Sequence, residues 1–123
     1  MKKIFLSFLT LISLLLSVSL PCLATEEVPV SVFVREDCQH CKDEKEFLKV
    51  LKETRSDIRI ISHDIDSEEG KKLFQAFTQS TKLSKATPIT LVGNTIIQGF
   101  DTAETTGKRI TDLIDASRNK TTL

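Results

Sequence analysis

Cys38 and Cys41, in the stretch Cys-Gln-His-Cys, are the residues whose type and spacing are best suited to chemistry. The apolar run before them is typical of a strand, and the charged, periodic run after them is typical of a helix. A helix start carries unpaired backbone N–H groups and partial positive charge, which stabilise the thiolate that attacks disulfides. Two cysteines one helical turn apart can also bond to each other. The pattern predicts a dithiol site in which one sulfur attacks and the other resolves.

A structural disulfide and a metal site are the alternatives for this cysteine pair. A disulfide that closes so short a segment restrains little of the unfolded chain, so stability alone is a poor reason for the spacing. A zinc site would have to add His40 and His63 to the pair, and ligands at those spacings fit a tetrahedral site poorly. We therefore expect redox chemistry and no metal.

Residues 1–24 are predicted to be a cleaved secretory signal peptide. Two lysines precede an apolar run over residues 4–20, and Cys22 and Ala24 supply the small residues of a cleavage site. A retained membrane anchor is the alternative, but serines interrupt the run and it is short for a membrane span. Cleavage would leave residues 25–123 as one domain with two cysteines, exported to an oxidising compartment such as the periplasm.

The charge balance excludes some classes of partner. The 123 residues include 17 basic and 17 acidic side chains, so no net charge attracts the chain to nucleic acid or to an anionic membrane surface. We therefore expect no nucleic-acid partner.

Four strands and three helices are predicted, in the order strand, helix, strand, helix, strand, strand, helix. The expected strands cover residues 28–34, 58–62, 88–92 and 95–97. The last two strands are separated by Gly93-Asn94, which is the sequence signature of a hairpin. A charged run with an apolar stripe follows Cys41, Asp66 and Asp101 in turn, and each run predicts a helix.

The three helices are expected to bury one stripe each. The residues assigned to these stripes are Phe47, Leu48 and Leu51, then Leu73, Phe74 and Phe77, then Ala103, Ile110, Leu113 and Ile114. Capping boxes are expected at Asp66 with Glu69 and at Asp101 with Glu104. The acids beside the cysteine pair are expected to be exposed and to oppose thiolate formation; these are Glu36, Asp37, Asp43 and Glu44.

This element order predicts an α/β fold. A strand–helix–strand unit implies a parallel pair with a right-handed crossover, and a hairpin adds antiparallel strands. A four-stranded mixed sheet flanked by three helices buries all the apolar faces. Cys38 then lies at the carboxyl end of the first strand, where open α/β sheets usually keep their sites.

The chain resembles the thioredoxin superfamily in its small glutaredoxin-like form. Cys38-Gln-His-Cys41 resembles the Cys-x-x-Cys active site after the first strand, and Ala86-Thr87-Pro88 resembles the cis-proline loop. Gly99-Phe100-Asp101 resembles the glycine and acidic positions that follow the hairpin in glutaredoxins. The resemblance covers nearly all of residues 25–123 and implies a thioredoxin-like fold.

The resemblance also implies roles for the site residues. Cys38 would be the exposed nucleophile and Cys41 the thiol that resolves the mixed disulfide. Pro88 would be cis, and Thr87 would offer backbone hydrogen bonds to a peptide or to glutathione. The alternative for Pro88 is an ordinary proline at a strand start.

Further positions are implied to bind substrate or to tune the cysteines. Arg35, Gly99 and Asp101 would complete the substrate site, although Arg35 taken alone is equally a solvated loop charge. Gln39 and His40 lie between the cysteines and would tune the thiolate, with a surface imidazole as the alternative for His40.

The sequence around the two cysteines differs from that usual in thioredoxins and in glutaredoxins. Thioredoxins usually carry Trp and Pro where this chain has Asp37 and Gln39, and glutaredoxins usually carry Tyr where it has His40. Glutaredoxins also carry Gly-Gly where this chain has Gln98-Gly99. A histidine before the second cysteine is the arrangement of exported disulfide oxidases, whose helical insertion has no counterpart here.

The expected function is an exported thiol–disulfide oxidoreductase that acts on protein thiols and disulfides. We expect a monomer without a bound cofactor, and a membrane-bound redox partner if the protein is a reductant. The alternatives are a glutaredoxin-like reductase with glutathione as co-substrate, and a binding module with a passive disulfide. Whether the site oxidises, reduces or isomerises stays open at this point.

Overall fold

The secondary structure follows the predicted order of strands and helices. A computed structural model describes residue 3 and residues 26–121. Its elements are β1 (Val28–Val34), α2 (Gln39–Thr54), β2 (Ile58–Asp64), α3 (Glu68–Thr81), β3 (Ile89–Val92), β4 (Thr95–Gln98), the π-helix η1 (Ala103–Gly107) and α4 (Lys108–Thr121). The predicted signal peptide and its cleavage site lie outside the described residues, apart from residue 3, so the leader stays a prediction.

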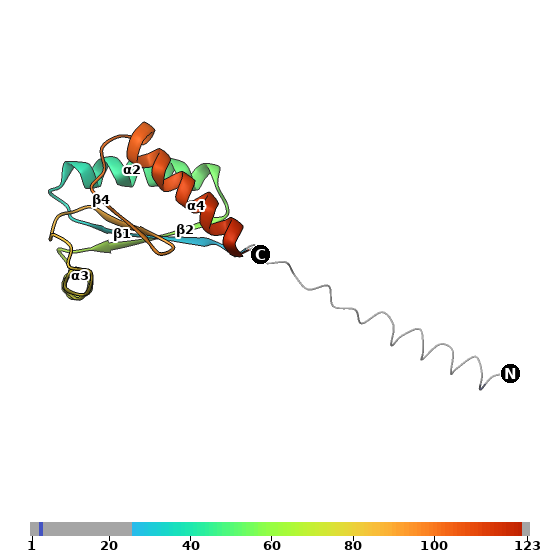
Figure 1. Cartoon of the computed structure of the whole chain (residues 1–123), viewed down its shortest axis with the longest axis horizontal. Coiled ribbons are helices and arrows are strands. Elements are labelled where there is room, and N and C mark those ends of the chain that lie inside the picture. The colour runs from blue at the N-terminus through green and yellow to red at the C-terminus, as the bar shows by residue number, and fades with distance from the viewer. Residues whose placement is uncertain (1–2, 4–25, 122–123) are drawn as a thin grey trace.

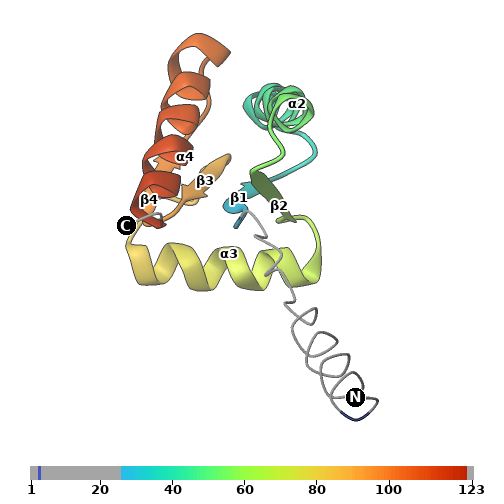
Figure 2. The same cartoon turned by 90° about the vertical axis from the view of Figure 1, so that its right-hand side faces the viewer.

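The four strands form one mixed sheet in the order β2-β1-β3-β4. β1 is parallel to β2 and antiparallel to β3, and the turn at Gly93-Asn94 joins β3 to β4 as an antiparallel hairpin. Helices α2 and α4 cover one face of the sheet and α3 covers the other (Figures 1 and 2). The predicted α/β architecture, a four-stranded mixed sheet flanked by helices, is therefore confirmed.

Alternation along β1 divides the core between the two faces. Val30 and Val32 are at most 1% exposed and pack under α2 and α4, whereas Phe33 points to the other face and meets Phe74 of α3. Both faces of the central strand are therefore covered, which explains its continuous apolar sequence. The strand delivers Cys38 from this buried layer directly to the start of α2.

Two residues assigned to buried stripes lie in solvent. Leu73 is 43% exposed, and Ala103 is also exposed. The buried residues of α3 are Gly70, Phe74 and Thr78. The buried stripe therefore repeats every four residues and does not include Leu73. Gly70 fixes this choice, because a Cβ there would lie 1.9 Å from the Asp64 carbonyl oxygen.

Both predicted capping boxes are wrong by one residue. Ser67, and not Asp66, caps α3, and its hydroxyl accepts the Gly70 N–H at 3.0 Å. Thr102, and not Asp101, caps η1, where Thr105 completes the box. Sequence alone cannot rank neighbouring capping residues, because carboxylates and hydroxyls accept the same backbone N–H groups.

Both ends of the described domain lie at the end of the sheet remote from the start of α2 (Figure 1). Glu26 and Glu27 line one surface groove together with Lys120 and Thr121. Among the described residues, none of the helices combines the length and the apolar character needed to cross a bilayer.

Candidate active site

Cys38 and Cys41 form a disulfide at the start of α2, with their Cα atoms 5.2 Å apart. Cys38 is the extended N-cap residue of the helix, and its Sγ accepts the Cys41 backbone N–H at 3.2 Å. Cys38 is half-buried and Cys41 is fully buried. A helix N-terminus therefore faces the more accessible sulfur, as thiolate chemistry requires.

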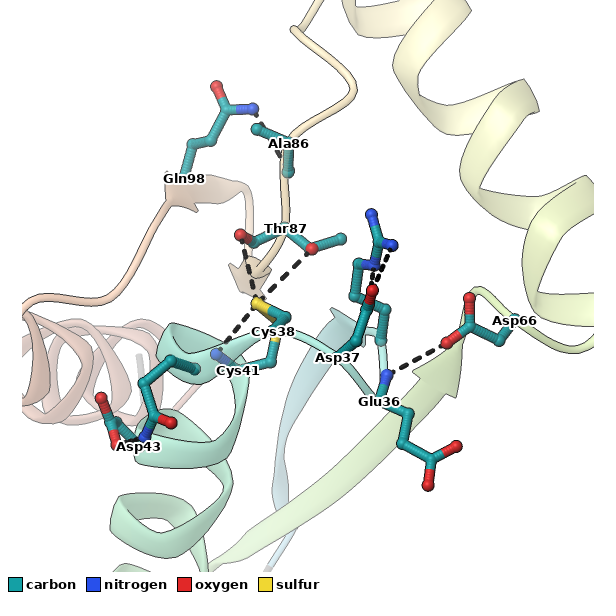
Figure 3. Close-up of a disulfide and its surroundings, with 11 residues drawn as sticks. Glu36, Asp37, Cys38, Cys41, Asp43, Asp66, Ala86, Thr87 and Gln98 are labelled. Carbon is teal, nitrogen blue, oxygen red and sulfur yellow. Dashed lines mark hydrogen bonds and ion pairs between the residues drawn. A yellow bond between two sulfur atoms is a disulfide. The ribbon is translucent and has the colours of Figure 1, made fainter.

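Thr87 lies beside this disulfide (Figure 3), and Pro88 follows it in the chain. The Thr87 hydroxyl donates toward Cys38 Sγ over 3.7 Å, and the Thr87 carbonyl oxygen lies at the same distance from that sulfur. The peptide bond between Thr87 and Pro88 is cis. Gly99, at a φ of 84°, donates its N–H to the Pro88 carbonyl oxygen at 2.8 Å. The residue that follows β4 therefore holds the proline loop by a backbone hydrogen bond.

Arg35 and Asp37 form an exposed ion pair on the loop that leads to Cys38. The Arg35 guanidinium donates to both carboxylate oxygens of Asp37, at 2.6 and 3.0 Å. Arg35 would have to exchange this partner to bind a substrate carboxylate, and the pair cancels its own charge near the sulfur. On the same loop, the Glu36 N–H donates to the Asp66 carboxylate at 3.0 Å.

The remaining predicted residues are Gln39, His40, Gly99 and Asp101. The side-chain amide of Gln39 donates a hydrogen bond to the Asp43 carboxylate at 2.8 Å. His40, Gly99 and Asp101 line one open groove of about 310 Å³, together with Arg109. The structure thus brings three of the predicted residues into one groove, whereas Arg35 does not line it.

Glu44 is the site residue that sequence reasoning placed wrongly. It is only 1% exposed, and one of its oxygens, Oε1, accepts a hydrogen bond from the Thr90 hydroxyl. The other oxygen, Oε2, is buried and has no hydrogen-bond partner among the described residues. Burial raises the pKa of Glu44 from 4.5 to about 7, against the opposing effect of the Thr90 hydrogen bond.

Glu44 lies on the same helix as the disulfide. It follows Cys41 by one helical turn on the buried side of α2. Its partner Thr90 pairs with Val32 across β1 and β3, on the face that meets α2, and comes two residues after Pro88. The spacing of Cys41, Glu44 and Leu48 was the available signal, because three and four residues are the steps of one helical face.

A metal site finds no support in the geometry. His63 stacks on Phe33 at a ring distance of 4.9 Å, and its Nε2 lies 2.9 Å from the Ser31 hydroxyl. Phe33 belongs to the face covered by α3, whereas Cys41 packs on the opposite face. Within residue 3 and residues 26–121, no group of three or more His, Cys, Asp or Glu side chains could hold a metal ion.

Comparisons with known proteins find structural relatives only. No family model matches the chain, and no curated protein matches its sequence. The chain is similar to the solved structure of glutaredoxin grx-1 from Archaeoglobus fulgidus, at 24% identity and a TM-score of 0.49, covering 63% of this chain and 80% of that one. It is also similar to the holo form of glutaredoxin C1 from Populus tremula x tremuloides, at 21% identity and a TM-score of 0.50, covering 75% of this chain and 80% of that one.

The likeness to the second of these structures concerns the fold. The four-stranded mixed sheet with its flanking helices is consistent with it. The chain therefore has a thioredoxin-like fold of the glutaredoxin-like form.

Proposed function

We propose that this protein is a thiol–disulfide oxidoreductase that exchanges disulfides with protein thiols through a mixed disulfide on Cys38. The observation that carries the proposal is the Cys38–Cys41 disulfide at the start of α2, with one accessible and one buried sulfur. Thr87 touches the accessible sulfur and offers backbone groups beside it. A passive disulfide has no need of this arrangement.

The exchange needs only the two sulfurs and the substrate. In the reduced protein, the Cys38 thiolate attacks a substrate disulfide, forms a mixed disulfide and releases one substrate thiolate. The Cys41 thiolate then attacks Cys38 Sγ, which restores the Cys38–Cys41 disulfide and releases the second substrate thiolate. Two electrons pass from the protein to the substrate, and the reverse sequence oxidises a substrate dithiol.

Glu44 supplies what the buried cysteine lacks, a nearby acid–base group. Cys41 is fully buried, so water cannot readily take its proton when it must become a thiolate. Glu44 is the buried carboxyl group on the same side of α2, and its pKa of about 7 leaves it able to take or return a proton near neutral pH. We assign it the proton of Cys41.

The setting of this reaction is proposed from the sequence. The leader predicted over residues 1–24 supports an exported protein, and the periplasm is the compartment in which such exchange acts on folding proteins. A reductant there needs an electron donor, for which a membrane-bound partner is suited.

A glutathione-dependent reductase is the second candidate. The groove that contains Gly99 and Asp101 favours it, because a small thiol bound there would lie near the active-site helix. The pairing of Arg35 with Asp37 weighs against this candidate, because the Arg35 guanidinium already binds a carboxylate and is not available for one of glutathione.

Reduction of insulin disulfides by the purified chain, with a dithiol as electron donor, tests the proposal. We expect Cys38→Ser to lower the rate to that of the uncatalysed reaction and Cys41→Ser to accumulate a mixed disulfide that mass spectrometry detects. Ser80→Ala, at an exposed position of α3, is the matched control, and we expect it to retain the full rate. A wild-type rate no greater than that of Cys38→Ser, with both insulin and a glutathionylated peptide, would leave only a binding module. Faster turnover of a glutathionylated peptide than of insulin would favour the second candidate.

A further inference from the structure

Gln98, the last residue of β4, is exposed, yet its side chain holds the loop that leads to Thr87. Its Nε2 donates to the Ser84 carbonyl oxygen at 2.8 Å and to the Ser84 hydroxyl oxygen at 2.7 Å. The same nitrogen donates to the Ala86 carbonyl oxygen at 3.4 Å. Figure 3 shows Gln98 reaching from the end of β4 to Ala86, next to Thr87.

The loop over residues 82–88 has few other supports. It contains neither helix nor strand. At its start the Leu83 N–H donates to the Thr78 carbonyl oxygen, and at its end Pro88 accepts the Gly99 N–H. Between these points, Gln98 is the only described side chain that hydrogen-bonds residues 84–86. One amide group therefore holds the middle of the loop.

Residues 84–86, which Gln98 holds, directly precede Thr87, the residue that contacts Cys38 Sγ. Thr87 directly follows Ala86, and both its hydroxyl and its carbonyl oxygen lie 3.7 Å from Cys38 Sγ. A shift of residues 84–86 would move these groups relative to the sulfur. It would also move the backbone that an incoming substrate strand meets.

We infer that Gln98 is a positioning residue for disulfide exchange: by holding residues 84–86 it keeps Thr87 in place against Cys38. This inference rests on the proposed function and adds a residue to it. Gln98 stands where glutaredoxins usually carry glycine, which has no side chain to hold the loop.

Gln98→Met tests the inference, because methionine keeps the length of the side chain and removes its donors. The matched control is Gln75→Met, since Gln75 is an exposed glutamine on α3. We expect Gln98→Met to raise the KM for a disulfide-containing peptide about fivefold with little change in kcat. We also expect it to speed hydrogen exchange at the Leu83 amide, which donates to the Thr78 carbonyl oxygen at the start of this loop. We also expect the pH midpoint of Cys38 alkylation to rise by about half a unit in the reduced protein.

A double-mutant cycle with Thr87→Val separates positioning from a general loosening of the fold. If Gln98 acts through the Thr87 hydroxyl, Gln98→Met shifts the alkylation midpoint less in the Thr87→Val background than in the wild type. Equal shifts in both backgrounds, or a Gln98→Met protein that behaves as Gln75→Met does, would overturn the inference while leaving the proposed function intact. If the wild type lacks exchange activity, the proposed function fails, and alkylation with hydrogen exchange still decides the role of Gln98.

Discussion

The pKa values of two carboxyl groups, those of Glu44 and Asp57, are shifted in opposite directions. Glu44, one helical turn after Cys41, has one hydrogen bond, and its other oxygen has no partner among the described residues. Burial raises its pKa to about 7. Asp57, before β2, accepts two hydrogen bonds from Arg55 and one from Arg118. The Arg55 hydrogen bond lowers the pKa of Asp57 to about 2.

The difference separates a functional end of the molecule from a structural one. The Asp57 carbonyl oxygen accepts the Val28 N–H at 2.8 Å, and Arg55 also pairs with Asp115 of α4 at 2.8 Å. The backbone hydrogen bond joins β1 to the residue before β2, and the ion pairs join that residue and Arg55 to α4. Glu44 makes a single hydrogen bond, to Thr90, and its carboxyl group titrates near neutral pH. Proton transfer requires a group that titrates in this range, whereas stability does not.

Asp57→Asn is the strongest test of the structural end. We expect it to lower the free energy of unfolding by about 3 kcal/mol, because it removes the charge that accepts from the half-buried Arg55 and from the exposed Arg118. Urea denaturation measures this loss, and the rate of insulin reduction below the unfolding transition is expected to stay unchanged. A slower exchange rate in folded protein would break the division between the two ends.

Glu44→Gln is the converse test. At pH 8 we expect the free energy of unfolding to rise by about 2 kcal/mol, because the variant no longer buries a charged carboxylate. We expect the resolving step to slow about tenfold or more, since the amide cannot accept the proton of Cys41. Stopped-flow release of substrate thiol measures the second effect. An unchanged rate across pH 6 to 8 would remove Glu44 from the mechanism.

The two carboxyl groups also predict opposite pH dependences of stability. The pKa of Glu44 is raised from 4.5 to about 7, so its contribution is complete below pH 4.5 and is lost as the pH rises to 7. The pKa of Asp57 is lowered from 3.8 to about 2, so its contribution is complete above pH 3.8 and is lost as the pH falls to 2.

Urea titrations at a series of pH values check both signs. We expect roughly 2 kcal/mol of stability to be lost between pH 4.5 and 7, and this loss to be absent in Glu44→Gln. The loss below pH 3.8 is expected to be smaller in Asp57→Asn than in the wild type. A flat wild-type profile between pH 4.5 and 7 would contradict the buried state of Glu44.

Thr87→Val gives the smallest expected effect and probes the functional end alone. Valine keeps the shape of the side chain and removes the hydroxyl that donates toward Cys38 Sγ. We expect the reduction potential of the cysteine pair to fall by about 10 to 20 mV, because the reduced state loses a partner for its thiolate. Equilibration with a glutathione buffer measures the shift. A rise in potential would mean that the hydroxyl favours the disulfide.

The element order and the cysteine site were predictable from local patterns. The alternating and continuous apolar runs, the turn at Gly93-Asn94 and the spacing of Cys38 and Cys41 each specify local structure. The thioredoxin-like topology then follows, because a crossover and a hairpin leave few arrangements for four strands.

Glu44 shows what local patterns do not determine. In a run of lysines and glutamates, composition predicts an exposed acid, and only the packing of α2 against Thr90 of β3 makes it buried. The bond between Gln98 and Ser84 is hidden for the same reason, since the two residues meet only after the sheet has formed. Contacts between distant segments decide both positions.

The shared location of the two ends of the described domain has a practical consequence. Because residues 26–27 and 120–121 line one groove at the end of the sheet remote from the start of α2, a fusion or a surface linkage at either end is directed away from the cysteines. A protein immobilised on a bead or an electrode through either terminus would therefore present its disulfide to the surrounding solution.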